Sequence, residues 1–354
     1  MKISKLLTNW YNTHARDLPW RHTKDPYKIW ISEIILQQTR IAQGTEYYLN
    51  FIKIFPDIKS LAEASEVDVL KLWEGLGYYS RARNLHASAK YIMEELNGNF
   101  PDNFKGISSL KGVGSYTAGA IASIAFNLPY HAIDGNVKRI ISRIFGIKED
   151  VNSRIGIQQI ESSLNKIMDE KEPGKFNQAL MDVGSMICTP KNPDCANCIL
   201  ISKCVAYKSN VVNDLPITYK KIKIRKRFFI YFLILQESNV LIRRRKEEDI
   251  WKGLFEFPLM EFKIMPEKEK WLIEFKKTFH LNNPSIEVSK ISPIFKHNLS
   301  HQKIEAQFIH IKISDLKEFS NKFDLNLVAI KNLKTFPFPR LTEKYIIDHL
   351  TEYQ

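Results

Sequence analysis

All four cysteines of this chain lie in one short segment, CTPKNPDCANCILISKC, which runs from Cys188 to Cys204. Their spacing is C-x6-C-x2-C-x5-C, with the inner thiols at Cys195 and Cys198. Disulfides at this density are typical of small secreted domains, whereas a chain of 354 residues can bury a substantial core without them. Four thiolates on one loop can instead surround a metal centre. The segment therefore predicts a metal-binding loop with four cysteine ligands.

The spacing leaves the metal open. Zinc sites usually pair two C-x2-C knuckles that lie far apart, and only one C-x2-C occurs here. One compact loop also suits an iron–sulfur cube, whose corners are more widely separated than the ligands of a single zinc ion. We interpret the loop as structural, and we expect it to hold Lys191–Asp194 and Lys203 for contact with phosphate.

The composition indicates a polyanionic partner. Lys and Arg outnumber Asp and Glu by 52 to 39, which gives a formal net charge of +13. Nucleic acid is the leading candidate, although a lysine-rich composition alone produces the same count. No signal-peptide pattern and no apolar run long enough to span a membrane is found, so we expect a cytoplasmic protein that makes no membrane contact.

The hydrophobic pattern changes along the chain. Up to about Tyr207 apolar residues recur at helical spacing, as in ISKLLTNWYNTHA and VDVLKLWEGL, whereas RFFIYFLIL and NVLIRRR later have the character of a strand pair. We predict a multidomain chain with an all-α domain over residues 1–208, a basic linker over 209–226 and a smaller α+β domain over 227–354. The basic run Lys220–Arg227 is either a phosphate contact or a solvated tether.

A glycine-containing turn is predicted between two helices at about residues 105–125. Gly112, Val113 and Gly114 follow one helical pattern, and the next begins near Ser115. Alternate glycines let the backbone turn sharply, and the free N–H groups of the second helix favour an anion such as phosphate. This pattern is typical of the hairpin found in proteins that bind DNA without sequence specificity. An ordinary helix–helix turn with a glycine C-cap is the alternative.

Together these segments resemble the helix–hairpin–helix base-excision DNA glycosylases that carry a cysteine-bound 4Fe–4S cluster, and within them the adenine DNA glycosylases. The resemblance lies in LPWR, PYKIWISEIILQQTR, WEGLGYYSRARNL, LKGVGSYTAGAI, DGNVKR and FNQALMDVGSMICT. LIRRRKEEDIWKGLFEFP and FKHNLSHQKI resemble the Nudix-like domain of that family, without the clustered glutamates of a Nudix hydrolase. The resemblance implies a monomeric repair enzyme that removes adenine paired with 8-oxoguanine or guanine in duplex DNA, with a 4Fe–4S cluster as cofactor.

Cleaving an N-glycosidic bond requires a proton for the leaving purine and a negative charge beside the sugar. The resemblance assigns the first role to Glu33 and the second to Asp134, with Tyr116 and Asn136 hydrogen-bonding around them. Glu33 needs a pKa raised towards about 6–7 by burial for this role. From helical period alone, Glu33 lies off the apolar stripe as a solvated glutamate, and Asp134 is a helix N-cap. Tyr116 and Asn136 are then a core-edge tyrosine and a second candidate cap.

Position 116 also bears on the reaction class. Related bifunctional enzymes, including endonuclease III, carry a lysine there whose amine attacks the sugar, and a phenol cannot form that Schiff base. Tyr116 therefore predicts a monofunctional glycosylase that leaves an abasic site. The alternatives are an endonuclease III-like glycosylase/lyase, a non-catalytic iron–sulfur DNA-binding module and an electron-transfer protein.

The resemblance also implies binding residues. Adenine contacts fall on Arg16, Leu18, Trp20, Arg21 and Gln178. DNA contacts fall on Gln37, Gln38, Tyr78, Gly112, Val113, Gly114 and Lys138, with Tyr78 as a wedge in the duplex. Recognition of 8-oxoguanine falls on Leu299, Ser300 and His301, where the family usually has Phe-Ser-His, so the aromatic stacking partner is replaced. For Tyr78 and Trp20, core packing is the alternative.

Overall fold

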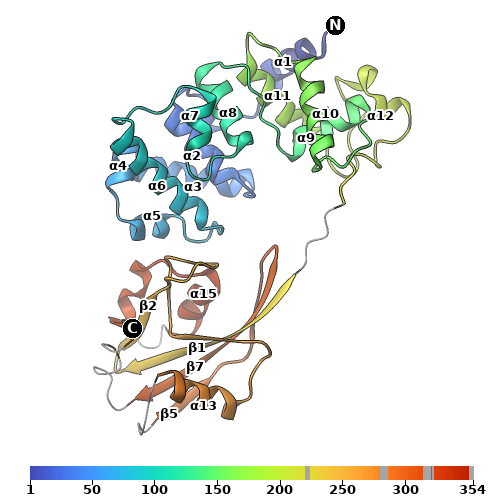
Figure 1. The fold of residues 1–354 in the computed structure, drawn as a ribbon. Helices are drawn as coiled ribbons and strands as arrows, with labels where there is room; N and C mark the ends of the chain where they lie inside the picture. The colour runs from blue at the N-terminus through green and yellow to red at the C-terminus, as the bar shows by residue number, and fades with distance from the viewer. Residues whose placement is uncertain (220–223, 280–285, 314–319, 321–322, 351–354) are drawn as a thin grey trace. The chain divides into compact units, whose positions relative to one another are not determined.

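The computed structural model describes residues 1–219, 224–279, 286–313, 320 and 323–350. The chain forms two compact units, one of Met1–Ala64 with Asn84–Lys220 and the other of Ser65–Arg83 with Lys221–Gln354. The predicted multidomain class is confirmed, with a helical part followed by a part built on a sheet (Figure 1). Residues 220–223 of the predicted basic linker lie outside the described part of the chain.

Within its described residues the first unit contains helices, joined by turns and loops, and no strand. Its elements are α1 (Ile3–His14), η1 (Pro19–Arg21), α2 (Pro26–Leu36), α3 (Ile41–Ile54), α4 (Ile58–Glu63), most of α6 (Ser80–Glu95), α7 (Phe104–Ser109), α8 (Ser115–Phe126), α9 (Gly135–Phe145), α10 (Arg154–Asn165), α11 (Pro173–Met186), η2 (Ile201–Lys203) and α12 (Val205–Lys208). Asp25, Asn103 and Asp134 cap the N-termini of α2, α7 and α9 through their side chains. Caps of this kind satisfy backbone N–H groups that no helical carbonyl reaches.

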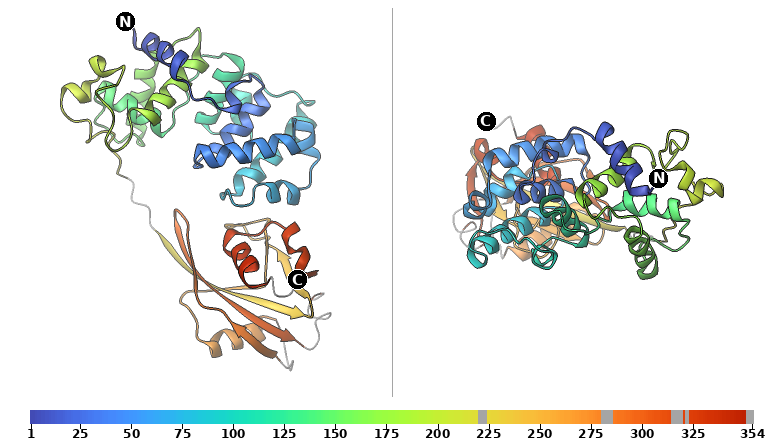
Figure 2. Two further views of the ribbon diagram at one scale, coloured as in Figure 1. Left: turned by 180° about the vertical axis from the view of Figure 1, so that it is seen from behind. Right: turned by 90° about the horizontal axis from the view of Figure 1, so that it is seen from above.

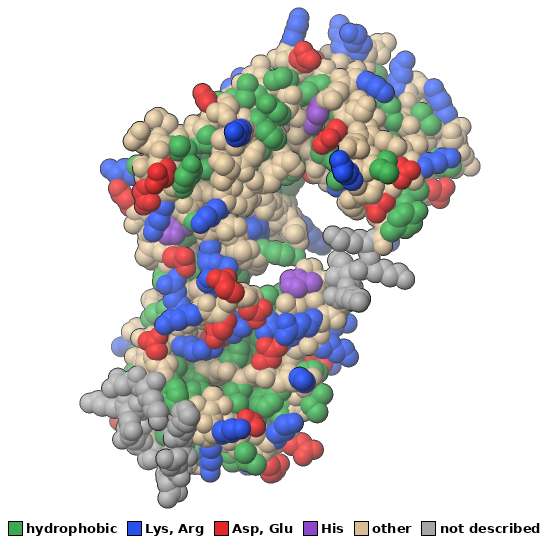
Figure 3. Space-filling view, viewed as in Figure 1, with side chains coloured by type: hydrophobic (Ala, Val, Ile, Leu, Met, Phe, Trp, Pro, Cys, Tyr) green, Lys and Arg blue, Asp and Glu red, His purple; other side chains and the backbone are tan. Residues whose placement is uncertain are grey.

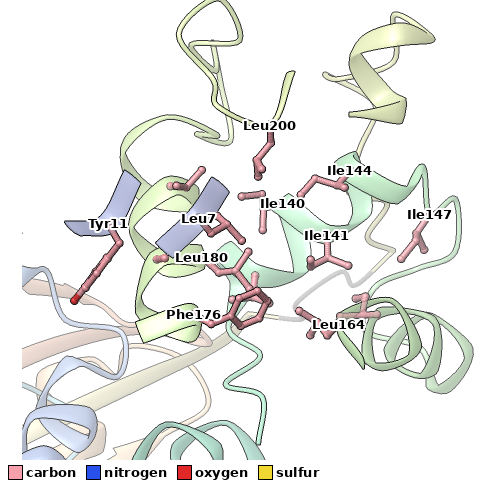
Figure 4. Packing of buried hydrophobic residues seen from close by; sticks show 14 of the residues in the cluster. Leu7, Tyr11, Ile140, Ile141, Ile144, Ile147, Leu164, Phe176, Leu180 and Leu200 are labelled. Carbon is pink, nitrogen blue, oxygen red and sulfur yellow. The ribbon is translucent and has the colours of Figure 1, made fainter. Parts of the chain in front are cut away.

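A hydrophobic cluster joins α1, α9, α10 and α11 (Figure 4). Ile140, Ile141 and Ile144 line one side of α9 and are almost completely buried, because apolar residues recur there at helical spacing. They pack with Leu7 of α1 and Leu180 of α11. Full burial of such a side chain is worth about 1.5–3 kcal/mol. The cluster therefore fixes α9 against α11, and with them the polar residues that these helices carry.

The predicted helix–hairpin–helix is formed by α7, the turn Leu110–Gly114 and α8. Gly112 has φ +79°, in the left-handed region, and a Cβ there would lie 2.9 Å from the Cβ of Asn84. Only glycine meets both conditions without strain. Val113 points inward and is 7% exposed. The turn is thus anchored by its two buried apolar side chains, Leu110 and Val113, while Gly112 and Gly114 carry no side chain that would shield the backbone.

A second close approach sets the start of α9. Gly119 in the middle of α8 lies against the segment that leads to Asp134, and a Cβ at this glycine would stand 2.0 Å from the carbonyl oxygen of His131. Asn177 on α11 donates to the carbonyl of Tyr130 at 2.8 Å from the other side. The segment before Asp134 is therefore held between α8 and α11.

The second unit contains α5 (Glu66–Leu72) and a sheet of eight strands in the order β3-β2-β1-β7-β5, with β4, β6 and β8 paired at its sides. The strands are β1 (Arg225–Gln236), β2 (Asn239–Arg244), β3 (Phe255–Glu256), β4 (Leu259–Phe262), β5 (Ile286–Ile291), β6 (Phe295–Asn298), β7 (Gln302–Ile313) and β8 (Asn326–Ala329). Long β1 and β7 run parallel, and the other pairs are antiparallel.

Two helices cover this sheet from opposite sides. Ile230, Phe232 and Ile234 of β1 pack against α13 (Lys268–Thr278). On the other face Tyr345 of α15 (Arg340–His349) stacks on Phe308 of β7. Figures 1 and 2 show α13 and α15 on opposite faces of the sheet. Because successive strand residues point to opposite faces, β1 is buried on both sides, which explains its nearly unbroken apolar sequence. A short η3 (Ile330–Thr335) precedes α15.

The surface charges can be compared with the predicted nucleic-acid partner, and the helices with the expectation of no membrane contact. On the face drawn in Figure 3, Lys and Arg side chains are interspersed with Asp and Glu, so that view does not outline a DNA path by charge alone. Within the described residues, no helix combines the length and apolar character needed to cross a bilayer.

We predict that Gly119→Ala destabilises the helical unit by about 1–3 kcal/mol, because the added methyl group requires α8 and the His131 segment to separate. Gly135→Ala is the matched control, since a Cβ at Gly135 meets nothing within 4 Å. Urea denaturation followed by circular dichroism measures both. Equal stability of the two variants would contradict the close approach of α8 and the segment before Asp134.

Candidate active site

Glu33 is buried because α2 is buried on all sides. Every residue of α2 from Ile29 to Ile35 is buried, so there is no solvent face for the glutamate to occupy. Glu33 is 8% exposed, and the hydroxyl of Tyr116 donates a hydrogen bond of 2.8 Å to its Oε2. The expectation from helical period alone, a solvated glutamate, is therefore wrong. The cause is tertiary: α8 covers the side of α2 that the pattern assigns to water.

Burial raises the pKa of Glu33 to about 7. The hydrogen bond from Tyr116 and the positive charge of Arg21 act in the opposite direction, while the negative charge of Asp134 adds to the rise. A carboxyl with this pKa is present in both protonation states near neutral pH, which is the condition for general acid catalysis. Its hydrogen-bond partner stays neutral, because burial and the nearby carboxylates raise the pKa of Tyr116 well above its usual value.

Asp134 serves as a helix cap and as a site residue at once. Its Oδ1 accepts from the backbone N–H of Val137 at 2.7 Å, and its Oδ2 accepts from the side-chain amide of Asn136 at 2.7 Å. Burial raises the pKa of Asp134, and these two hydrogen bonds oppose the rise by favouring the ionised form. The cap expected from sequence is present, and it aims the carboxylate at the same cavity as Glu33.

The two carboxyls meet on a cavity of about 210 Å³. It is enclosed by α2, α8, α11 and the segments around η1 and the start of α9. The five predicted adenine contacts and the four predicted catalytic residues all line it: Arg16, Leu18, Trp20, Arg21, Glu33, Tyr116, Asp134, Asn136 and Gln178. Trp20 is nearly buried, yet it faces this space, so packing and contact with a ligand are compatible for it.

A second cleft of about 530 Å³ opens next to the first and shares Glu33, Tyr116 and Asp134 with it. Gln37, Gln38 and Lys138, all predicted to contact DNA, line this second space. The arrangement gives an inner chamber of the size of one base and an outer cleft that meet at the two carboxyls.

Some lining residues were missed from the sequence. Met181 and Ser185 line the inner cavity from α11, three and seven residues after Gln178, and the sulfur of Met181 lies 3.9 Å from the Tyr116 hydroxyl. Their spacing places them on one helix face with Gln178, so the helical period could have found them. Leu36 lines both spaces from the end of α2, and its apolar side chain gives no such signal.

The residues predicted to recognise 8-oxoguanine lie in the second unit, in the turn between β6 and β7. The Oγ of Ser300 is 2.9 Å from the hydroxyl of Tyr78 and 3.2 Å from Nδ1 of His301. Tyr78 has φ +49° and is 41% exposed, so it does not pack in a core. Tyr78, Leu299, Ser300 and His301 line a cavity of about 520 Å³ together with Trp251. The hairpin residues Gly112–Gly114 do not line the cavities described here.

The cysteine loop brings its four sulfurs to one place. Cys188, Cys195, Cys198 and Cys204 line one small cavity of about 20 Å³, and all four are free thiols. Within the described residues no three His, Cys, Asp or Glu side chains are gathered closely enough to hold a single metal ion. The candidate metal centre is therefore recognised by the four thiols that line one cavity. The buried Arg143 places a positive charge beside them, with its Nη1 at 3.3 Å from Cys188 Sγ. This donor set fits a group bound by four thiolates that carries a net negative charge.

Hydrogen bonds link this loop to the lining of the inner cavity. Arg139 on α9 donates to the carbonyl of Cys188 at 2.7 Å and to Oδ1 of Asn136 at 2.8 Å. Asn136 in turn donates to Asp134. Gly184 allows α11 to come this close, because a Cβ there would lie 2.8 Å from the Cβ of Asn136. The loop therefore supports the orientation of the Asp134 carboxylate.

Comparisons with known proteins agree with this architecture. Residues 31–167 match the HhH-GPD superfamily base excision DNA repair protein family, and residues 230–348 match the NUDIX domain. The chain is 36% identical to the adenine DNA glycosylase of Buchnera aphidicola subsp. Schizaphis graminum over 346 residues, covering 97% of both chains. The chain belongs to the adenine DNA glycosylase family.

A human relative and two solved structures are also similar to this chain. The human adenine DNA glycosylase is 42% identical over 209 residues, which are 56% of this chain and 38% of the human one. Among solved structures, a thermostable thymine-DNA glycosylase matches with a TM-score of 0.53 and 30% identity, covering 58% of this chain and 95% of that one. An endonuclease III–DNA covalent intermediate, at 20% identity and a TM-score of 0.51 over 58% of this chain and 94% of that one, shows the same fold.

We predict that Glu33→Gln stabilises the protein at neutral and alkaline pH. The folded-state pKa of Glu33 is raised from 4.5 to about 7, so the wild type loses stability as pH rises through this range, and the glutamine has no proton to lose. The advantage of the variant grows to about 2–3 kcal/mol near neutral pH and then levels off. Urea denaturation across pH measures it, with exposed Glu46→Gln on α3 as the control. A pH-independent difference would refute the raised pKa.

Proposed function

We propose that this protein hydrolyses the N-glycosidic bond of adenine paired with 8-oxoguanine or guanine in duplex DNA and leaves an abasic site. The observation that carries the proposal is the pair of carboxyls, buried Glu33 and half-buried Asp134, on one base-sized cavity. Adenine must leave the base stack to reach them, at a cost of a few kcal/mol. The inner cavity takes the extrahelical base, and the outer cleft takes the sugar and its phosphates.

Glu33 acts as the general acid. In its protonated state it gives its proton to N7 of the purine, which makes the base a better leaving group. The Tyr116 hydroxyl fixes the carboxyl by donating to Oε2, so the other oxygen is free to face the base. After the bond breaks, the Glu33 carboxylate can accept a proton from the attacking water. Burial makes both steps accessible near neutral pH, because it brings the pKa of Glu33 to about 7.

Asp134 acts as the negative charge beside the sugar. The N–H of Val137 and the amide of Asn136 hold its two oxygens and favour its ionised form. Positive charge develops on the sugar as the bond to adenine lengthens, and a fixed carboxylate stabilises it. Burial thus raises the pKa of both carboxyls, but Asp134 has two hydrogen-bond donors that favour its ionised form where Glu33 has one, and this difference suits the two halves of the reaction.

The reaction stops at the abasic site in this proposal. Tyr116 supplies no amine for attack on the sugar. The nearby Lys138 lies in the outer cleft, and its Nζ donates to Oδ1 of Asn152 at 3.0 Å. This favours a monofunctional glycosylase over the endonuclease III-like alternative.

Four thiolates from Cys188, Cys195, Cys198 and Cys204 are proposed to hold a 4Fe–4S cluster. Such a cluster cross-links the loop, and its structural role is supported by the hydrogen bonds that run from the loop through Arg139 to Asn136. Arg143 complements the negative charge of the thiolate ligands. The chain's own residues carry the catalytic steps, and the loop holds α9 and its neighbours in place for them.

Ser300, His301 and Tyr78 are proposed to read the 8-oxoguanine opposite the adenine. The hydroxyls and the imidazole lie within hydrogen-bond reach of one another at one cavity and offer donors and acceptors to an oxidised base edge. Leu299 can contribute contact area but no ring stacking. As a monomer acting on chromosomal DNA, the protein would work in the cytoplasm at the nucleoid.

We predict that wild-type protein converts a duplex with one 8-oxoguanine:adenine pair into a product that breaks only after alkali. Glu33→Gln and Asp134→Asn each slow adenine release at least about 100-fold, because each removes one half of the acid and charge-stabilising pair. The assay is a denaturing gel of the labelled adenine strand, with Glu172→Gln as the control carboxylate. Strand breaks without alkali would point to a lyase, and absence of release by wild type to a non-catalytic DNA-binding module.

We predict that the double variant Ser300→Ala, His301→Ala loses discrimination. The ratio of excision rates on 8-oxoguanine:adenine and guanine:adenine falls roughly tenfold, since two polar partners of the oxidised base are removed. The guanine:adenine rate itself changes little. Asn326→Ala, an exposed polar position on β8, is the control. An unchanged ratio would exclude this turn from recognition.

A further inference from the structure

One carboxylate stands directly behind the wall of the inner cavity. Asp182 lies on α11, one helical turn after Gln178, and its side chain is 0% exposed. Arg16 and Arg21 both line the cavity, and both bind this carboxylate. Asp182 therefore holds two of the groups that form the wall without facing the cavity itself.

The contacts fix both guanidinium groups in orientation. Arg21 binds in a bidentate manner, with Nη1 at 2.6 Å from Oδ2 and Nη2 at 2.7 Å from Oδ1 of Asp182. Arg16 donates from Nε to Oδ1 at 2.7 Å, from Nη2 to the same oxygen, and from its backbone N–H to Oδ2 at 3.3 Å. Arg21 also donates to the carbonyl of Arg16 at 3.1 Å and stands 5.4 Å above the ring of Tyr11. Charge-assisted bonds of this number leave the two side chains little freedom.

Tyr11 connects the same wall to the neighbouring residue of α11. Its ring belongs to the hydrophobic cluster, and its hydroxyl points away from that cluster and donates to Oε1 of Gln178 at 2.5 Å (Figure 4). The Gln178 amide nitrogen is then left for a ligand in the cavity. Asp182 and Tyr11 thus hold three of the residues proposed to contact adenine.

The cluster also sets the charge next to the catalytic acid. Two arginines and one carboxylate carry a net positive charge, because a guanidinium does not lose its proton. Burial alone would raise the pKa of Asp182, but the hydrogen bonds and charges of Arg21 and Arg16 outweigh it and lower that pKa. Glu33 faces Arg21, Tyr116 and Asp134, and of these Arg21 and Tyr116 favour its ionised form. The net positive charge near Glu33 therefore depends on how fully the Asp182 carboxylate offsets the charges of Arg16 and Arg21.

We propose that Asp182 is a positioning residue for adenine excision, which fixes Arg16 and Arg21 in the cavity wall and offsets one of their two charges beside Glu33. This inference rests on the proposed function, in which protonated Glu33 is the acid. Without the carboxylate, two uncompensated guanidiniums favour ionised Glu33, so the acid is lost at lower pH. Without Arg16, a neutral Arg21–Asp182 pair remains, and protonated Glu33 persists to higher pH.

The test is the pH profile of single-turnover adenine excision by the full-length chain, with enzyme in saturating excess over a duplex with one 8-oxoguanine:adenine pair. Asp182→Asn shifts the alkaline limb of the profile towards acid by about 0.5–1 pH unit, and Arg16→Gln shifts it towards alkali by a similar amount. Glu172→Gln makes the same change of carboxylate to amide at the residue directly before α11, at an exposed side chain paired with Lys175, and leaves the limb in place.

The opposite directions separate this role from a merely structural one. If both variants lower the rate equally at every pH without moving the limb, Asp182 only supports the fold and the inference is wrong. If Asp182→Asn does not fold, as judged by circular dichroism, the direction of the Arg16→Gln shift decides alone. Failure of the proposed function is distinct, because the wild type then releases no adenine or has no alkaline limb that depends on Glu33.

Discussion

The hydrogen bond from Tyr116 to buried Glu33 is the contact on which the candidate active site depends. It joins α2 to α8 at the point where the inner and outer spaces meet, and it lies in the part of the cavity that Asp134 reaches from α9. A carboxyl buried without a partner would cost several kcal/mol when ionised. One donor moderates this cost and still leaves the pKa near neutrality. Had Glu33 been exposed, as its helical position alone indicates, its pKa would lie near the ordinary value of a glutamate and its carboxyl would be ionised at neutral pH.

The rest of the helical unit can be understood as support for this arrangement. The apolar faces of α9 and α11 pack together, so the cap residue of α9 and the polar row of α11 reach the same cavity. Gly119 lets the segment before Asp134 lie directly on α8, and Arg139 connects the start of α9 to the cysteine loop. Asp134 caps α9 by accepting from the Val137 N–H, and this bond together with the one from the Asn136 side-chain amide also orients its carboxylate.

Local features could be predicted from the sequence, and features set by distant neighbours could not. The cysteine loop, the turn at Gly112 and the cap at Asp134 are each encoded within a few residues, and the apolar run of β1 marks a strand buried on both faces. The burial of Glu33 depends on α8, which lies far along the chain. Asp182 gave no signal either, since its role arises from Arg16 and Arg21, more than a hundred residues away. Resemblance to a family supplied the assignment of Glu33, where periodicity alone gave the wrong environment.

The two carboxyls proposed to act in catalysis differ mainly in what surrounds them. Glu33 receives one hydrogen bond from a neutral phenol, whereas Asp134 receives a backbone N–H and a side-chain amide at the N-terminus of a helix, where the helix dipole also favours a negative charge. Burial raises the pKa of both carboxyls, and at Asp134 two donors oppose that rise where Glu33 has one. Arg21 could have removed the difference, because an unpaired guanidinium beside Glu33 would favour its ionised form as well. The bidentate contact with Asp182 keeps that charge partly offset, so the separation of roles between the two carboxyls depends on a residue that neither of them touches.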